Sequence, residues 1–310
     1  MSAMHVACAA DERYVPHCAT AVRSLTASNP GVAITVHLLH GPELSAKSVA
    51  RLGGMSGGEL TIVAHAVDPG AVAGLPPWGR IPETMWYRIL LPDLLPDVDR
   101  VLYLDADVLV LDALTDLWGL PLDAHYLAAV TNVPERHRLG HAAELGLAGP
   151  ERYFNSGVLL LNLKLMRRDG CTAALRERAR RDLDRLLWPD QDVLNLVLGE
   201  RRIALDPRWN LMNSIRRFPW AADLLGRAQI AEAIARPAII HFEGPAENKP
   251  WHVLCDHPAR PIYEAHRGHT PWARYRREGL TPGTAARLLR RRLLASPAAD
   301  ARASASTVRP

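Results

Sequence analysis

Short apolar runs rich in β-branched residues alternate along this chain with segments of helical period. The first unit predicts a strand over residues 5–11, a helix over 17–28 and a strand over 33–41. A helix closed by glycines and a third strand over 59–68 repeat the unit. Alternating strands and helices predict an α/β fold whose doubly wound, mainly parallel sheet carries helices on both faces.

The length of 310 residues, 48% of them hydrophobic, provides enough apolar material for one large core. Since α/β domains reach about 250 residues before they split, we expect a main domain over 1–255 and a basic helical extension over 256–295. Residues 296–310, SPAADARASASTVRP after Ala295, contain no aromatic side chain, and we expect them to be disordered.

The N-terminal residues MSAMHVACAADERY lack a basic segment followed by a long apolar stretch, so we expect no signal peptide. The cysteines are scattered without CxxC spacing, as in a reduced compartment: Cys8, Cys18, Cys171 and Cys255. These features predict a cytoplasmic protein. The net charge of +4 is modest, and we expect no nucleic-acid partner.

Polar residues end four of the predicted strands. In an open parallel sheet, ligands bind beyond the carboxyl ends of the strands, so such residues are the first candidates for a site. The strand ends carry Asp11, the pair Asp105 and Asp107, Asn155, and His241.

Residues 100–112, RVLYLDADVLVLD, predict the strongest strand of the chain, and the triplet Asp105-Ala106-Asp107 follows its apolar run VLYL. If the strand continued, both carboxylates would lie on one face, where a divalent cation would relieve their repulsion. An imidazole from His241 would complete an O, O, N ligand set, which Mn²⁺ tolerates better than Mg²⁺ does. Solvated strand-end aspartates and a structural histidine are the alternative.

Two neutral amides, Asn155 and Gln191, are candidates to hydrogen-bond sugar hydroxyls. Asp190 and Asp192 flank Gln191, and Asp190 opens a predicted helix directly after a proline. A helix N-cap is therefore the alternative role for at least one of these two aspartates.

The chain carries no Gly-rich phosphate loop, no Ser-His-Asp arrangement and no Cys-His metal cluster. The glycines of ARLGGMSGGE have neither P-loop nor dinucleotide-binding spacing and predict a turn.

With these residues in view, the chain resembles glycosyltransferase family 8, the family of glycogenin and of bacterial lipopolysaccharide α-galactosyltransferases and α-glucosyltransferases. The resemblance runs from residue 5 to about residue 252 and rests on five motifs in family order and at family spacing. They are AADERY, VLYLDADVLV, YFNSGVLLLNLK, PDQDVLN and HFEGPAENKPWH.

The resemblance implies a GT-A fold and transfer of a hexose, usually from UDP-glucose or UDP-galactose with Mn²⁺, with retention of anomeric configuration. It also implies residue roles. Ala9 and Asp11 would bind uracil, and Arg88 would lie beside the donor. Asp105 would bind the metal and the ribose, and Asp107 and His241 would bind the metal. Gly244 and Lys249 would bind the diphosphate. Asn155 and Gln191 would lie at the sugars.

This chain departs from the family pattern at two positions. Four residues, 245–248, stand between Gly244 and Lys249, where relatives usually have two, so we expect the loop to bulge. Arg13 stands where relatives often place an asparagine or another small polar residue.

Retention requires either two displacements or attack on the face that the diphosphate leaves. Because an amide is barely nucleophilic, Gln191 is a poor nucleophile, and we favour same-face attack in which the leaving phosphate takes the acceptor proton. Asp190 or Asp192 as a transient nucleophile is the alternative. Two other functions stay open: a sugar nucleotidyltransferase, which usually needs an early Gly-rich basic loop, and a non-catalytic nucleotide-sugar-binding protein.

A basic segment over 284–294 places arginines among leucines and alanines. It predicts either an amphipathic helix on an anionic membrane, which would suit a glycolipid or lipopolysaccharide acceptor, or a solvated C-terminal helix. The identity of the acceptor and the choice between glucose and galactose lie beyond the sequence.

Overall fold

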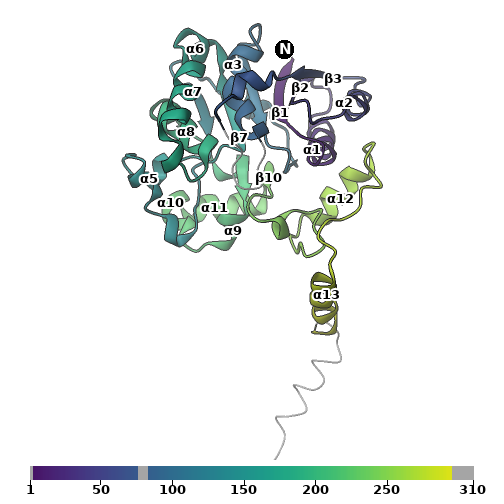
Figure 1. The fold of residues 1–310 in the computed structure, drawn as a ribbon. Coiled ribbons are helices and arrows are strands. Elements are labelled where there is room, and N and C mark those ends of the chain that lie inside the picture. Colours follow the sequence, from purple (N-terminus) through teal and green to yellow (C-terminus); the bar gives the residue numbers. More distant parts are fainter. Residues whose placement is uncertain (1–2, 76–82, 295–310) are drawn as a thin grey trace, which may run out of the picture.

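A seven-stranded sheet forms the centre of the computed structural model, which describes residues 3–75 and 83–294 (Figure 1). From one edge to the other, its strands are β3 (Leu60–Ala66), β2 (Ile34–His40), β1 (Met4–Ala9), β4 (Arg100–Leu104), β7 (Val158–Asn162), β6 (Leu127–Ala129) and β8 (Arg202–Ala204).

The strands of this sheet are mainly parallel, which confirms the prediction. Strands β1, β2, β3 and β4 pair in parallel, β6 pairs in parallel with β8, and β7 runs antiparallel to both neighbours. From β1 the chain moves outward to β2 and β3, and then returns to β4 on the other side of β1. The strand order therefore reverses between β1 and β4, the point at which α/β sheets bind ligands.

Helices cover both faces of the sheet (Figure 1). Helix α1 (Val15–Ser28) packs on one face, and α3 (Leu91–Leu94), α6 (Leu163–Arg168), α7 (Cys171–Asp182) and α8 (Pro189–Leu198) pack on the other. The other α-helices of the described residues are α2 (Ala46–Gly53), α4 (Thr115–Trp118), α5 (His141–Glu144), α9 (Asn213–Arg217), α10 (Ala221–Leu225), α11 (Arg227–Ala235), α12 (Arg260–Gly268) and α13 (Pro282–Leu294).

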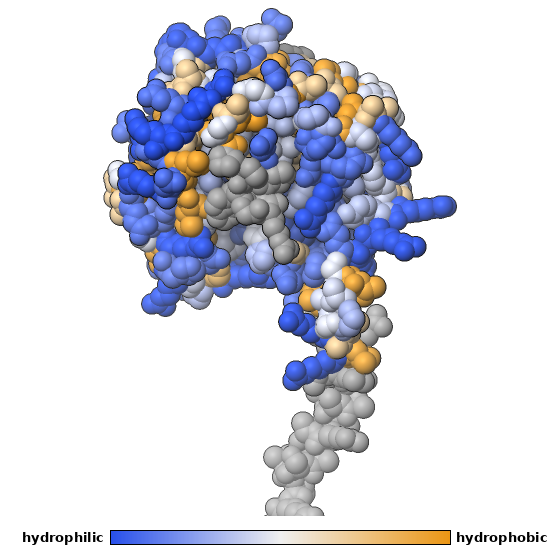
Figure 2. Space-filling model, in the orientation of Figure 1, coloured by the Kyte–Doolittle hydropathy of each residue, from blue (hydrophilic) through white to orange (hydrophobic). Residues whose placement is uncertain are grey.

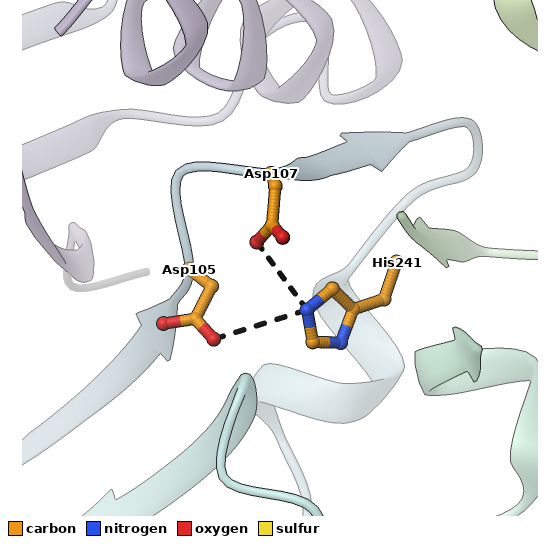
Figure 3. Close-up of side chains that lie close together, drawn as sticks. All are labelled: Asp105, Asp107 and His241. Atoms are coloured by element: carbon orange, nitrogen blue, oxygen red, sulfur yellow. Dashed lines mark ion pairs between the residues drawn. The ribbon is translucent and has the colours of Figure 1, made fainter. Parts of the chain in front are cut away.

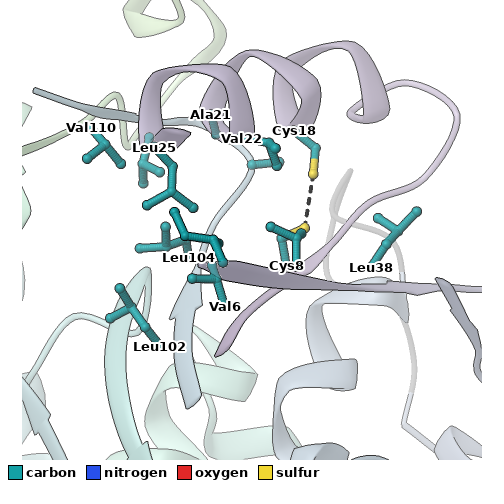
Figure 4. Close-up of a cluster of buried hydrophobic side chains, with 14 of the residues drawn as sticks. Val6, Cys8, Cys18, Ala21, Val22, Leu25, Leu38, Leu102, Leu104 and Val110 are labelled. Carbon is teal, nitrogen blue, oxygen red and sulfur yellow. Dashed lines mark hydrogen bonds between the residues drawn. The ribbon is translucent and has the colours of Figure 1, made fainter. Parts of the chain in front are cut away.

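The alternation of side chains along a strand produces these two cores. Val6 and Cys8 of β1 pack against α1, where the Sγ atoms of Cys8 and Cys18 lie 3.0 Å apart (Figure 4). Ala7 of β1 and Tyr103 of β4 belong to the core on the opposite face. Both strands are thus buried on two sides, which fixes the positions of the residues that follow them.

A second, three-stranded sheet contains β5 (Val108–Val110), β10 (Ile239–His241) and β9 (Leu211–Met212). The expectation of one strand over residues 100–112 was wrong, because the chain leaves the large sheet after Leu104 and enters the small one at Val108. Asp105 keeps a backbone hydrogen bond to Gly157 O, and Asp107 O accepts one from Phe242 N. The acidic triplet therefore bridges the two sheets.

The chain beyond residue 255 begins by packing on the rest of the protein. Tyr263 of α12 is fully buried, and its hydroxyl lies 2.7 Å from Nδ1 of His17 in α1. Helix α13 extends away from the body, and its Leu289 is 60% exposed (Figure 1). The tail predicted over 296–310 lies outside the described residues. Among the residues that are described, no helix combines the length and apolarity needed to cross a bilayer.

Buried and partly buried histidines are expected to destabilise the fold in mild acid. Burial lowers the pKa of six of them, to about 4 for His37 and His257; the six are His5, His17, His37, His65, His257 and His266. Below pH 6.5 the unfolded chain therefore binds protons that the folded chain does not, so stability falls as the pH falls. The raised pKa values of His241 and Asp190 act in the opposite direction but involve two groups.

We expect the urea midpoint to be lower at pH 5.5 than at pH 7.5. The fully buried His17 contributes at most about 1.4 kcal/mol per pH unit to this loss. Replacement of His37 by glutamine, which does not titrate, should reduce the slope. Equal midpoints at the two pH values would contradict the prediction.

Candidate active site

The three residues predicted to bind a metal lie together where the two sheets meet (Figure 3). Asp105 follows β4, Asp107 precedes β5, and His241 ends β10, which pairs antiparallel with β5. Nε2 of His241 lies 3.3 Å from Oδ1 of Asp107 and 3.8 Å from Oδ2 of Asp105. One ligand atom from each residue fits within 4.8 Å of the others.

Gly157 keeps the space between these side chains open. A Cβ atom at Gly157 would lie 2.2 Å from Cε1 of His241 and 2.8 Å from Oδ2 of Asp105. Two carboxylates and one imidazole are donors that Mn²⁺ accepts. The residues therefore fit a divalent cation of this kind, and their role as its ligands stays a prediction.

His241 is held by Asn210, whose Oδ1 lies 3.1 Å from Nδ1 of the imidazole. If Nδ1 donates this hydrogen bond, Nε2 keeps its lone pair toward the carboxylates, the arrangement that outer partners impose on metal-binding histidines. Burial alone lowers the pKa of His241, but the negative charges of Asp107 and Asp105 outweigh it and raise the pKa overall.

Lys249 contacts the same cluster from the loop after β10. Its Nζ donates to Oδ2 of Asp107 and, over 2.8 Å, to the backbone oxygen of Phe242. Burial opposes charge on both partners, but their attraction dominates, so the pKa of Lys249 is raised and that of Asp107 lies well below its usual range. The longer spacing from Gly244 to Lys249 is taken up by the 3-10 turn Ala246–Asn248.

Gly244 begins this loop with φ of +90°, a conformation that favours glycine. A Cβ atom there would lie 2.7 Å from Nδ2 of Asn248, which donates to the backbone oxygen of Glu243. Gly244 thus lets the loop fold back on itself close to Lys249.

Arg88 connects the three predicted metal ligands to helix α8. It belongs to the 3-10 helix Glu83–Leu90; its Nη2 lies 2.8 Å from Oδ1 of Asp105, and its Nε lies 3.2 Å from Oδ2 of Asp190. The guanidinium also lies over the ring of Tyr103, 4.6 Å from its centroid. Burial raises the pKa of Asp190 to about 6, although Arg88 opposes the shift.

Asn155 precedes β7 and does not close a strand, so the expectation for its position was wrong. It still reaches the same edge of the sheet, because β7 runs antiparallel to β4 and starts where β4 ends. Its Nδ2 donates to Oε1 of Gln191 over 3.2 Å, and the same oxygen accepts from Ser156 N over 2.9 Å. Arg88 donates to the backbone oxygen of Ser156 over 2.8 Å, which ties the amides to the acidic cluster.

Asp192 has a different environment from Asp190. It is fully buried, and it accepts hydrogen bonds from the backbone amides of Leu187 and Trp188, 2.6 and 3.1 Å away, and from the hydroxyl of Tyr153. Its Oδ1 also lies 3.0 Å from Nε2 of His141. This side chain ties the residues before α8 to its first turn. The expectation that at least one of the two aspartates is the helix N-cap was wrong, because the N-cap is Trp188 and no side chain caps the helix.

Ala9 and Asp11 lie at the end of β1, on the other side of the switch point from β4. Oδ1 of Asp11 accepts from Tyr14 N over 2.7 Å, so its own turn orients this carboxylate. Burial raises the pKa of the Tyr14 hydroxyl, and the charges of Lys249 and Asp107 also act on it. The rings of Tyr14 and of Trp251 in the loop that carries Lys249 meet edge to face with centroids 5.9 Å apart, so the turn after β1 lies near the diphosphate side of the predicted site.

Sequence reasoning missed Gly157, Asn210 and Ser156. The glycine of the motif YFNSG was the available signal for Gly157, since a glycine directly before a buried strand indicates a close approach. Asn210 gives no local signal: it lies 31 residues before His241, and only the fold brings its Oδ1 to the imidazole.

A mainly parallel sheet with an acidic and basic cluster at its switch point defines an α/β protein built to hold a charged ligand. Comparison with known proteins identifies the family. The family model described as glycosyl transferase family 8 matches residues 5–255, and the chain belongs to this family. Its members' glycosyltransferase activity agrees with the cluster described above.

Individual relatives agree with the family assignment. The chain is 34% identical over 198 residues to general stress protein A of Bacillus subtilis, covering 62% of this chain and 68% of that protein. It is 25% identical over 277 residues to lipopolysaccharide 1,3-galactosyltransferase of Salmonella typhimurium, covering 87% and 79%. A crystal structure of galactosyltransferase LgtC with donor and acceptor sugar analogs superimposes with a TM-score of 0.78 at 30% identity, covering 91% and 99%. The fold is accordingly the GT-A fold of these enzymes.

Proposed function

We propose that this glycosyltransferase is metal-dependent and transfers glucose or galactose from a UDP-sugar to an acceptor hydroxyl with retention of configuration. The observation that carries the proposal is the cluster of Asp105, Asp107 and His241 beside Lys249, at the switch point of the sheet. In this family a divalent cation would stabilise the negative charge that develops on the diphosphate as the glycosidic bond breaks.

Different residues in and around this cluster would bind different parts of the donor and its cation. Asp105, Asp107 and His241 would hold the cation, Mn²⁺ in preference to Mg²⁺ because one ligand is an imidazole. Ala9 and Asp11 would hold uracil at the end of β1. Gly244 and Lys249 would hold the diphosphate.

Lys249 has one N–H donor left for a phosphate oxygen. An ammonium group has three donors, and Nζ uses two of them on Asp107 and the backbone of Phe242. A third donor on a positively charged, buried nitrogen is available for the leaving phosphate, and it would add to the electrostatic stabilisation of the departing charge.

The sugar side of the site consists of Asn155, Gln191 and Asp190. We favour attack by the acceptor on the face that the diphosphate leaves, with the leaving phosphate taking the acceptor proton. If a transient protein nucleophile takes part, Asp190 is the candidate, because Asp192 is fully buried and its oxygens are occupied by four donors. Asp190 is 12% exposed at its side chain and pairs with Arg88.

The two alternative functions fit the residues of the site less well. A nucleotidyltransferase would carry a Gly-rich basic loop after the first strand, but the turn at 11–14 contains Asp11 and Glu12 and no glycine. A binding protein without catalysis has no need of Asp190, Arg88 and Asp105 in one charged row. The residues of the site therefore favour an enzyme over either alternative.

Release of UDP from a panel of UDP-sugars by the purified protein tests the proposal. With Mn²⁺ and no acceptor, we expect slow release from UDP-glucose or UDP-galactose, loss of release with a chelator, and loss in Asp107→Ala. The matched control is Asp116→Ala, which removes an exposed aspartate of α4 and should release UDP normally. Metal-independent release, or full activity of Asp107→Ala, would refute the role of the cluster.

The acceptor we propose is a glycan or glycolipid such as lipopolysaccharide, reached from the cytoplasmic face of a membrane. The four cysteines are free thiols, which suits a reduced compartment. Helix α13 presents apolar and basic side chains outside the body of the protein, among them exposed Leu289 (Figure 2). An amphipathic, arginine-rich helix of this kind suits an anionic bilayer surface.

Removal of residues 283–310 is expected to abolish sedimentation of the protein with anionic vesicles while leaving acceptor-free UDP release unchanged. The expected affinity is weak, since one short basic helix adds roughly 1 kcal/mol per arginine near the surface. Vesicles of neutral lipid serve as the control. Unchanged sedimentation of the truncated protein would show that α13 does not bind the membrane.

A further inference from the structure

A segment beyond the region matched by the family model packs against a loop of the candidate site. We call residues 270–279, which follow α12, the strap. Its Glu278 N donates to Trp251 O over 2.9 Å, and Val253 N donates to Glu278 O over 3.0 Å. The strap therefore pairs, at Trp251 and Val253, with the backbone of the loop that carries Lys249.

The approach of the strap to this loop is close enough to require a glycine. Gly279 has φ of +78°, and a Cβ atom on it would lie 1.9 Å from Nε2 of His252. Any larger residue would separate the strap from the loop. The contact is thus built into the fold at this point.

The side chain of Glu278 extends from the strap to the turn after β1. Its Oε2 accepts from Nη2 of Arg13 over 2.8 Å, and its Oε1 accepts from the hydroxyl of Tyr275 over 2.7 Å. Arg13 lies within the turn that begins at Asp11. One residue therefore holds both the turn at the predicted nucleoside side and the loop at the predicted diphosphate side.

A buried aromatic cluster also connects the turn after β1 to the loop that carries Lys249. The rings of His17 and Trp251 stack face to face, with centroids 3.5 Å apart and planes 9° apart. Tyr263 of α12 contacts His17 through its hydroxyl, and Tyr14 meets the edge of Trp251 at 5.9 Å. Glu278 adds a second, more exposed connection between the turn and the loop through Arg13, whose side chain is 52% exposed.

We propose that Glu278 is a positioning residue for the nucleotide donor, acting through Arg13 and through the backbone of Trp251 to set the distance between the nucleoside and diphosphate sides of the site. This inference rests on the proposed function. Glu278 itself touches no reacting atom, so it should govern donor affinity and leave the chemical step unchanged. The C-terminal segment would then complete the donor site.

Binding of UDP in the presence of Mn²⁺, measured by calorimetry on the full chain, tests the inference. We expect Glu278→Ala to weaken binding about fivefold, the upper end for a solvent-screened ion pair. We expect kcat for UDP release to stay within twofold while the donor KM rises in parallel with the dissociation constant. Glu278→Gln keeps an acceptor oxygen and should recover part of the affinity.

A double-mutant cycle separates positioning by Glu278 from a general effect. If Glu278 acts through Arg13, adding Glu278→Ala to Arg13→Ala should weaken binding by less than it does in the wild type. The matched control is Arg277→Ala, which removes a neighbouring strap residue that pairs over 2.6 Å with Glu264, away from the turn. This control should bind UDP as the wild type does.

The outcomes distinguish this inference from the function on which it rests. Wild-type protein that does not bind UDP overturns both. Wild-type and Glu278→Ala proteins that bind UDP equally overturn the inference alone, as do additive effects of Glu278→Ala and Arg13→Ala or an equal loss in Arg277→Ala. A fall in kcat at unchanged donor KM would also overturn it, because positioning of the nucleotide predicts the reverse.

Discussion

Replacement of Gly157 by alanine is expected to abolish metal-dependent UDP release. The added methyl group would lie 2.2 Å from Cε1 of His241 and 2.8 Å from Oδ2 of Asp105, so at least one of these predicted ligands must move. Because a cation contributes several kcal/mol of transition-state stabilisation, we expect a loss of at least about 100-fold. The backbone of Gly157 lies outside the left-handed region, so the loss would follow from the occupied space and not from backbone strain.

Direct measurement of Mn²⁺ binding distinguishes this mechanism from misfolding. Gly157→Ala should bind Mn²⁺ much more weakly while unfolding in urea close to the wild-type midpoint. Gly199→Ala is the matched control, because a Cβ atom on Gly199 would meet no heavy atom within 4 Å. A Gly157→Ala protein that binds Mn²⁺ with wild-type affinity would show that the ion is not held between Asp105 and His241.

The sequence was sufficient to predict the fold because each strand and helix has its own periodic pattern. The apolar runs that became β1, β2 and β3 are separated by helical segments, and that order alone favours a parallel sheet. The switch point between β1 and β4 then places the ends of these strands together, which is why Asp11 and Asp105 could be selected as site residues.

The break between β4 and β5 could not be predicted in the same way. Residues 100–112 have one apolar pattern, and only the pairing of β5 with β10, more than 120 residues later, shows that the pattern belongs to two sheets. The direction of β7 is a similar case. Strand direction depends on pairing partners far away in the chain, so Asn155 was placed at the right edge of the sheet for the wrong reason.

Contacts between side chains distant in sequence could not be predicted either. The contacts of His241 with Asn210 and of Arg88 with Asp190 join residues 31 and 102 positions apart. A motif identifies a residue type that suits a reaction. The fold brings the partners that orient that residue next to it, and no local sequence pattern indicates which residues they are.

Asp190 and Asp192 are expected to respond in opposite ways to the same substitution by asparagine. Asp190 is partly accessible and pairs with Arg88, which also pairs with Asp105. Asp190→Asn removes a charge beside the predicted sugar site, and we expect kcat for UDP release to fall roughly 100- to 1000-fold, as for loss of one electrostatic group in an active site. Stability should change little, because Arg88 keeps Asp105 as a partner.

Asp192→Asn should act on the fold. Asp192 accepts from two backbone amides and one hydroxyl and contacts His141, whereas an asparagine has one acceptor oxygen and turns an NH₂ group toward some of these donors. We expect a loss of about 3 kcal/mol in the free energy of unfolding, since buried donors would lose their partners. Folded Asp192→Asn should release UDP at a rate close to that of the wild type.

Urea unfolding and single-donor kinetics on both variants decide between these roles. Loss of kcat without loss of stability in Asp190→Asn, and the reverse in Asp192→Asn, would separate the reacting carboxylate from the one that fixes α8. The pair is a stringent test because the two aspartates lie two residues apart in one helical turn and undergo the same chemical change. If Asp192→Asn instead stopped the reaction in a stable protein, the buried aspartate would have to approach the sugar, and the assignment of Asp190 would be wrong.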